Sequence, residues 1–181
     1  MRYFETIQLK DGRECTLRNG TQADGQAVLE VFQLTHGETD FLLSYPDENT
    51  FDLVGEEAFL RKLEESDNEL ELLAIVDGQV VGSAGIDAVG SKYKVRHRAH
   101  FGISVLKAYW GLGIGRALTE SCIGLARQAG YTQLELQAVA DNRNAIRLYE
   151  SAGFREYGRN PKGFRSRETG WQELVLMRLE L

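Results

Sequence analysis

The sequence predicts a mixed α+β domain, and three observations lead to that prediction. Its 181 residues suit one domain, because domains commonly contain about 100–200 residues. Segments that alternate like strands and segments with helical spacing follow one another, with no repeat, low-complexity tract or Pro/Gly/Ser-rich linker between them. Residues 99–139 read as strand, helix and strand, and such a crossover implies a parallel pair with a right-handed connection.

The first 66 residues predict one strand and two helices. Residues 13–18 alternate weakly and are expected to form a first strand. Apolar residues recur at near-helical spacing after Thr21, so a helix begins there with Thr21 or Asp24 as its cap. A polar loop with Pro46 follows, and a second helix is expected over residues 54–66.

The rest of the chain predicts a hairpin, three further strands and two helices. Residues 70–76 and 79–86 flank Asp77-Gly78, a dipeptide typical of a two-residue primed turn. Residues 99–105 alternate as a strand, and residues 114–129 form the clearest amphipathic helix, with Gly130 at its C-terminal cap. A strand at 134–139, a short helix at 144–152 and a closing strand at 174–179 complete the prediction.

Composition argues against several classes of protein. No apolar run approaches the roughly 18 residues of a membrane span, and the first residues lack the apolar core of a secretory signal. Cys15 and Cys122 are too few for a disulfide scaffold and have no metal-ligand spacing. We therefore expect a reduced, cytoplasmic protein with no metal site and no membrane partner.

Charge is distributed unevenly along a chain of net charge −6. Residues 37–71 hold 12 acidic and two basic residues, whereas residues 92–167 hold 14 basic and five acidic ones. Two interpretations remain open: two solvated surfaces, or a cationic substrate at the first region and a polyanionic cofactor at the second. A pI near 5.2 and the lack of a basic-aromatic array argue against nucleic acid.

A glycine-rich turn lies between the strand at 99–105 and the following helix. Gly111, Gly113 and Gly115 let the backbone approach a ligand closely, and the helix N-terminus adds a positive field, so the turn suits a phosphate. A tight turn that binds nothing is the alternative. A Walker P-loop is excluded because Arg116 follows Gly115 where that motif has lysine. A dinucleotide fingerprint lacks its third glycine at Arg116, although Glu135 lies near the distance of a ribose contact.

Two sequence blocks together resemble a known family. Trp110-Gly111-Leu112-Gly113-Ile114-Gly115 is similar to motif A of the GNAT superfamily of N-acetyltransferases, (Gln/Arg)-x-x-Gly-x-(Gly/Ala), with Trp110 in place of Gln or Arg. Residues 142–154 match the superfamily's N-x-x-A-x-x-L-Y-E-x-x-G-F signature at every named position. The resemblance covers residues 71–179 well and residues 13–70 loosely.

The resemblance implies a fold, an activity and a donor. The fold would be one domain over 1–181 with α/β/α layers: a mostly antiparallel sheet of about six or seven strands, one splayed parallel pair and about four helices. Residues 13–70 would supply the first strand and the substrate-side helices, and 71–179 the cofactor-binding core. The activity would be transfer of acetyl from acetyl-CoA to a primary amine of a small molecule, polyamine or protein, by direct attack in a ternary complex.

The resemblance also assigns cofactor-binding and catalytic residues. The pyrophosphate would lie on the amides of the turn and pantetheine along a strand edge, with two asparagines and a tyrosine nearby: Ile103, Ser104, Val105, Gly111, Leu112, Gly113, Ile114, Gly115, Arg116, Asn142, Asn144 and Tyr149. Tyr149 is the candidate general acid for the departing thiolate; its phenol, with an ordinary pKa of about 10, needs help such as the nearby helix N-terminus near Asn144. Packing in the core is the alternative for Tyr149.

The base and the acceptor site are less sharply defined. Many family members have glutamate where this chain has His100, and an imidazole suits the task of taking a proton from the amine, although a strand histidine is often structural. Substrate recognition would fall to residues 33–56, with His36, Glu38, Asp40 and Tyr45 as candidates to attract a cationic amine. A solvated acidic loop is the alternative.

Two other functions remain as competitors. A non-catalytic acyl-CoA-binding module of the same fold gains support from His100, and a remote alternative is a nicotinamide-dependent oxidoreductase that uses the glycine turn. Besides an amine substrate, a second copy of the chain is the partner that we consider, as a homodimer.

Overall fold

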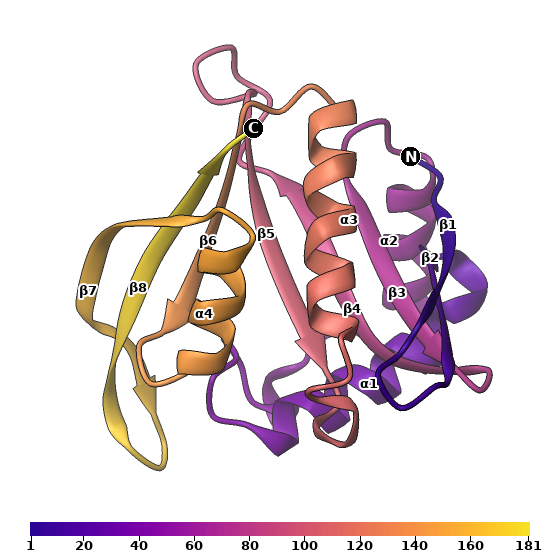
Figure 1. The fold of residues 1–181 in the computed structure, drawn as a ribbon, viewed down its shortest axis with the longest axis horizontal. Coiled ribbons are helices and arrows are strands. Elements are labelled where there is room, and N and C mark those ends of the chain that lie inside the picture. Colours follow the sequence, from indigo (N-terminus) through magenta and orange to yellow (C-terminus); the bar gives the residue numbers. More distant parts are fainter.

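One eight-stranded sheet runs through the protein in the computed structural model, which describes residues 1–181 (Figure 1). The spatial order is β1-β2-β3-β4-β5-β6-β8-β7. The strands are β1 (Phe4–Gln8), β2 (Glu14–Asn19), β3 (Leu70–Val76), β4 (Gln79–Ala88), β5 (Arg98–Val105), β6 (Gln133–Val139), β7 (Arg155–Ser166) and β8 (Gly170–Glu180). The helices are α1 (Gly25–Glu38), α2 (Leu53–Glu64), α3 (Ile114–Gln128) and α4 (Arg143–Ser151). The mixed, mostly antiparallel α+β fold with four helices is confirmed.

Local sequence signals explain where several elements begin and end. Asp24 accepts hydrogen bonds from the Thr21 amide and hydroxyl at 2.9 and 2.8 Å, which cap the short 3₁₀ turn Gln22–Asp24 that precedes α1. Asp24 is the N-cap residue of α1, but its side chain accepts from no amide of that helix. Asp77 and Gly78 both have positive φ, 51° and 78°, as the predicted primed turn between β3 and β4 requires. Gly130, with φ of 84°, follows the end of α3.

The parallel strands β5 and β6 diverge after a short paired segment. All other neighbouring strands are antiparallel, whereas β5 and β6 run parallel and pair only where residues 98–100 face 133–135. Beyond that point β5 keeps its partner β4 through Val105, and β6 keeps its partner β8 through Val139. The predicted splayed pair is therefore present, with an unpaired edge on the β6 side of β5.

The two faces of the sheet are covered by different helices. Figure 1 shows α3 and α4 in front of the sheet and α1 and α2 behind it. Leu72 and Ala74 of β3 join α3 residues in the main core, whereas Leu73 lies with Leu60 of α2 on the opposite face. The same alternation places Glu71 behind the sheet, on the α1/α2 side.

The sheet has two strands that the sequence analysis did not name, one at each edge. β1 precedes residues 13–18, which therefore form the second strand and not the first. β7 is mostly exposed and contains Pro161, a residue that sheets tolerate at an edge. Both strands form because their backbones pair with β2 and β8, and neither carries a strong apolar alternation. The sheet consequently has eight strands where six or seven were expected.

None of the four helices is long and apolar enough for a membrane span. Cys15 and Cys122 are both buried free thiols, and burial raises the pKa of each.

Candidate active site

The glycine turn leaves β5, makes one short 3₁₀ turn at Lys107–Tyr109 and enters α3 with Gly113 as its N-cap. Gly111 and Gly113 have positive φ, 79° and 106°, and a Cβ added at either would meet no atom within 4 Å. Gly115 lies against Leu148 of α4, where an added Cβ would be 3.4 Å from that side chain. Two of the glycines thus keep a cradle open, and the third lets α3 approach α4 closely.

Free backbone donors line this cradle. None of the amides of residues 111–116 donates a hydrogen bond in the turns, loops and caps of the protein, since the first bond of α3 starts at the Ala117 amide. Unpaired amides at a helix N-terminus, combined with the helix dipole, form an anion site. The residues present therefore fit the pyrophosphate of a CoA thioester, as the resemblance predicts.

Trp110, which departs from the family motif, has a structural role. Its indole Nε1 donates to the Val105 carbonyl at 2.6 Å, which closes the turn against the end of β5. The Lys10 amide donates to the Leu112 carbonyl at 3.2 Å, so the β1–β2 hairpin supports the turn from the other side. The turn is held in shape without the usual Gln or Arg.

Tyr149 lies where the splayed strands separate. Its side chain on α4 packs edge-on against Phe101 of β5, with ring centroids 6.2 Å apart, and Phe101 follows the last residue of β5 that pairs with β6. The residue is only 8% exposed, and burial raises the pKa of its phenol to about 12. The expected help from the helix N-terminus is absent, because Tyr149 sits in the last turn of α4, about 9 Å along the axis from Arg143.

The two asparagines of the second motif lie at the start of α4. Asn142 is the N-cap, and its side chain accepts from the Ala145 amide at 3.3 Å. Asn144 accepts from Arg147 at 2.6 Å. The amide nitrogens of both side chains remain available as donors on the side of the splayed pair that carries Tyr149.

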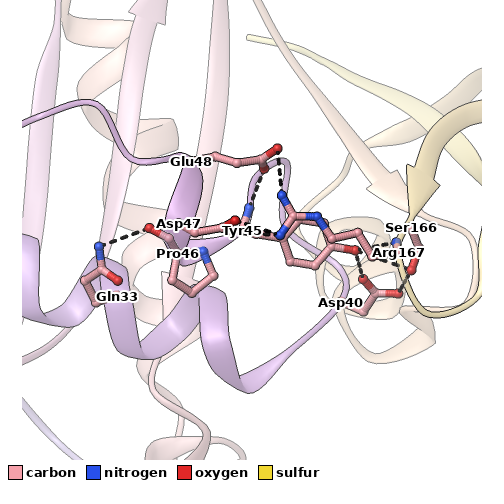
Figure 2. A network of polar contacts seen from close by, with 8 residues as sticks. All are labelled: Gln33, Asp40, Tyr45, Pro46, Asp47, Glu48, Ser166 and Arg167. Atoms are coloured by element: carbon pink, nitrogen blue, oxygen red, sulfur yellow. Dashed lines mark hydrogen bonds and ion pairs between the residues drawn. The ribbon is translucent and has the colours of Figure 1, made fainter.

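Two of the residues predicted to attract an amine, Asp40 and Tyr45, lie in the segment between α1 and α2 and share a hydrogen-bond network with Ser166 (Figure 2). Asp40 accepts hydrogen bonds from the hydroxyls of Tyr45 and Ser166 at 2.9 and 2.6 Å, and from Thr169 and Gln172 at 3.2 and 3.0 Å. Burial alone would raise the pKa of Asp40, but these hydrogen bonds hold it below its usual value. Asp40 and Tyr45 thus tie this segment to the β7–β8 turn.

His36 and Glu38 are also occupied by contacts within the protein. The His36 ring stacks on Phe32 at 3.7 Å, and burial lowers the pKa of its imidazole. Glu38 accepts from the Lys107 amide at 2.7 Å, which joins the end of α1 to the glycine turn. All four residues predicted to attract an amine are thus engaged in contacts within the protein.

A cavity of about 320 Å³ lies between α1, α2 and the rear face of β3–β5. Its lining comprises Val28, Phe32, Ser44, Glu48, Asn49, Thr50, Phe51, Glu56, Phe59, Glu71, Ser83 and Ser104. Sequence analysis missed Glu71 and gave Glu56 no specific role. The available signal for Glu71 was a lone carboxylate in the otherwise apolar run of β3.

His100 lies on the same rear face but away from the cavity. It is exposed, it faces Asp87 across the β4–β5 pair, and it is not among the lining residues. Ser104, which lines the cavity, is four residues further along β5, or roughly 13 Å. The structure therefore separates His100 from the end of β5 that meets the glycine turn.

Comparison with known proteins agrees with this geometry. The chain is 28% identical to a GNAT-family acetyltransferase from Streptococcus pneumoniae, with a TM-score of 0.88 over 92% of this chain and 99% of that one. The yncA protein from Salmonella typhimurium, whose structure contains its cofactor acetyl-CoA, is 25% identical with a TM-score of 0.80 over 92% and 94% of the two chains. The N-alpha-acetyltransferase RimI of Mycobacterium tuberculosis is 38% identical over 88 residues, which are 49% of this chain and 53% of that protein. The match thus spans about half the length of this curated relative.

The chain has a splayed parallel pair of strands that ends in an open glycine turn lined by free amides. It shares its fold with an acetyltransferase of known structure, so its class is that of the acetyltransferase folds. The family model described as Acetyltransferase (GNAT) family matches residues 32–154, which is more than half of the chain. The chain belongs to the GNAT acetyltransferase family.

Proposed function

We propose that this protein transfers the acetyl group of acetyl-CoA to a primary amine of a small molecule or a peptide. The observation that carries the proposal is the run of free amides at residues 111–116, directly beyond the unpaired edge of β5. The free amides would bind a pyrophosphate, and the adjacent strand edge would pair with the amides of a pantetheine arm. The acetyl-CoA bound to the yncA protein supports the same donor here.

Residues on the glycine turn, on β5 and on α4 would each contact a different part of acetyl-CoA. The amides of residues 111–116 would bind the pyrophosphate, the backbone of Ile103–Val105 would bind pantetheine, and Asn142 and Asn144 would contact the donor arm. Acetyl-CoA supplies an activated acetyl group as its thioester, which a neutral amine can attack directly. Burial raises the pKa of Tyr149 to about 12, so the phenol stays protonated but is a weak acid. It would protonate the sulfur that leaves only as it takes up a proton from the attacking nitrogen.

The amine must lose a proton before it can attack, because its ordinary pKa of about 10 keeps it protonated at neutral pH. The rear face of the sheet offers titratable groups for this step. His100 is the residue at the position where many family members have glutamate, while the carboxylates of the cavity lie nearer to the end of β5. Charge favours the same division of ligands: three acidic residues of 37–71, Glu48, Glu56 and Glu71, line the cavity, and basic residues are concentrated in 92–167.

Thermal unfolding with acetyl-CoA, CoA, NADH or ATP tests the donor first. A ligand at about 100 times its Kd should stabilise the fold by roughly 2.7 kcal/mol. Stabilisation by CoA species alone supports the proposal, whereas stabilisation by NADH alone would favour an oxidoreductase. Thiol release from acetyl-CoA on addition of amines then separates an enzyme from a module that only binds acyl-CoA.

A further inference from the structure

The rear cavity reaches the part of β5 that the donor arm would use. Ser104 lies in both, because it lines the cavity and belongs to residues 103–105 of β5, which pair with β4 but not with β6. Glu71 of β3 and Ser83 of β4 complete the floor of the cavity on the same face. A molecule in the cavity would therefore lie against the strand that holds the donor in the proposed function.

Two glycines keep the path between Glu71 and β5 clear. Gly85 pairs with Glu71 on one side and with Gly102 on the other. A Cβ at Gly85 would lie 2.9 Å from Glu71 Oε2, so the carboxylate extends over this glycine. A Cβ at Gly102 would meet nothing within 4 Å. The Glu71 carboxylate thus extends toward β5 over Gly85, and neither Gly85 nor Gly102 has a side chain in its way.

Glu56 enters the cavity from α2 as a buried carboxylate. It is only 6% exposed, and none of the hydrogen bonds or ion pairs of the structure involves its side chain. Burial is the cause that raises its pKa. Because no fully buried side-chain oxygen of the protein lacks a hydrogen-bond partner, the unpaired Glu56 carboxylate is reached from the cavity, where a cationic ligand group would pair with it.

The rest of the lining combines apolar and neutral polar side chains with Glu48 and contains no cationic residue. Phe32, Phe51 and Phe59 supply aromatic rings, the last two with centroids 5.8 Å apart. No Lys or Arg is among the lining residues. Arg167 reaches Glu48 at the rim, at 3.4 Å, but is also paired with Asp47 at 2.8 Å. An acceptor that carries a carboxylate would find no unpaired positive group here.

We propose that this cavity binds a small cationic amine without an acid group, with its ammonium between Glu56 and Glu71, and that Glu71 takes the proton that the amine must lose. The inference rests on the proposed acetyl transfer and specifies its acceptor and its base. Glu56 attracts and orients the cation, and the aromatic side chains contact its carbon skeleton by apolar and cation–π interactions.

The proton and electron balance is simple. One N–H proton of the ammonium moves to the Glu71 carboxylate, and the nitrogen lone pair forms the N–C bond while the C–S bond of the thioester breaks. The sulfur receives a proton from Tyr149, and the second proton lost by the nitrogen restores that phenol. Glu71 releases its proton to water, so one proton is produced for each acetyl group transferred.

The surroundings of Glu71 suit this role near neutral pH. Burial raises its pKa to about 7, the negative charges of Asp87 on β4 and Glu56 on α2 act in the same direction, and Ser83 opposes them. From the other neighbouring elements, Glu48 faces the cavity beside α1 and His100 of β5 faces Asp87. Because the ionised form is the base, activity should fall as the pH drops below about 7.

Matched acceptor pairs test the substrate class. Pentane-1,5-diamine is compared with lysine, and 2-phenylethylamine with phenylalanine, by thiol release from acetyl-CoA. The member without the carboxylate should have at least a tenfold higher kcat/KM in one pair or both. Equal or higher kcat/KM for the amino acids would overturn the inference while leaving the proposed acetyl transfer intact.

Two variants test the carboxylates, with exposed Glu14 on β2 as the control position. Glu71→Gln should lower kcat at least 100-fold and remove the acidic limb of the pH profile, while the Kd of acetyl-CoA changes less than twofold. Glu56→Gln should raise the KM of the amine at least tenfold with a smaller effect on kcat. Glu14→Gln should match the wild type in each measurement.

The outcomes distinguish failure of Glu71 as the base from failure of the proposed acetyl transfer. Wild-type kcat and an unchanged acidic limb in Glu71→Gln would refute the base while the acetyl transfer stands. If Glu71→Gln does not fold, the pH profile of Glu56→Gln decides, because loss of its charge must shift the acidic limb to lower pH. Acetyl-CoA binding without thiol release for any amine would refute the proposed function and this inference together.

Discussion

Substituting Gly113 by alanine separates the two reasons why a glycine is present in the turn. Gly113 has a φ of 106°, a region in which a residue with a Cβ is strained by about 1–2 kcal/mol. The added methyl would clash with no protein atom, because nothing lies within 4 Å of it. It would instead project into the open cradle beside the free amides of residues 111–116.

Gly130 provides a matched control at the other end of α3. Its φ is also positive, 84°, and its added Cβ would likewise meet nothing within 4 Å. Gly113→Ala and Gly130→Ala should therefore lose similar stability, about 1–2 kcal/mol, or roughly 2–8 °C in melting temperature for a chain of this size. Gly113→Ala alone should also weaken acetyl-CoA binding at least tenfold, which corresponds to about 1.4 kcal/mol.

Calorimetric titration with acetyl-CoA, together with thermal unfolding of both apo variants, measures the two effects. Equal loss of affinity in the two variants would show that strain in α3, and not the open cradle, controls binding. Unchanged affinity in Gly113→Ala, at the expected loss of stability, would refute the assignment of the pyrophosphate to this turn.

Three further substitutions test other parts of the site. Tyr149→Phe should lower turnover about 10²- to 10⁴-fold with less than a twofold change in acetyl-CoA affinity, and unchanged turnover would remove its role as acid. His100→Ala should change kcat less than threefold, since His100 is exposed and outside the cavity; a larger loss with a shifted pH profile would restore it as the base. Asp40→Ala should lower stability by about 1–2 kcal/mol and raise the KM of the amine, because it frees the segment that Tyr45 and Ser166 hold. The pKa of Asp40 is lowered in the fold, so its contribution is present above the ordinary carboxyl pKa and is lost as the pH falls through the lowered value. The stability gap to wild type should therefore close in acid, whereas exposed Asp67→Ala should show no gap at any pH; a pH-independent gap would contradict this reasoning.

Consecutive residues were enough to predict the backbone around the glycine turn. The splayed pair, the turn and α3 depend on strand alternation, on glycines that accept positive φ and on a helix that starts without acceptors for its first amides. These are local properties of the backbone, and each can be inferred from a short stretch of sequence. The same holds for the primed turn at Asp77-Gly78 and for the capped 3₁₀ turn Gln22–Asp24 that leads into α1.

The two edge strands, and the surroundings of Asp40 and Tyr45, depend on contacts between segments that are distant in the sequence. β1 and β7 are exposed, so their pairing with β2 and β8 leaves little apolar pattern in the sequence. Asp40 and Tyr45 were expected to meet a substrate, but the β7–β8 turn, more than 120 residues away, supplies Ser166 to the same carboxylate.

Burial is what the linear sequence could not convey. Tyr149 has a raised pKa because β5 and α4 enclose its ring, and not a lowered one from a helix N-terminus. Glu56 looks like an ordinary carboxylate in the sequence and Glu71 like a lone acid in an apolar strand, and they become reactive candidates only because α2 and β3 bring both to one cavity, where burial raises the pKa of each. The free energy of a charge depends on everything that surrounds it, and only the tertiary structure brings those groups together.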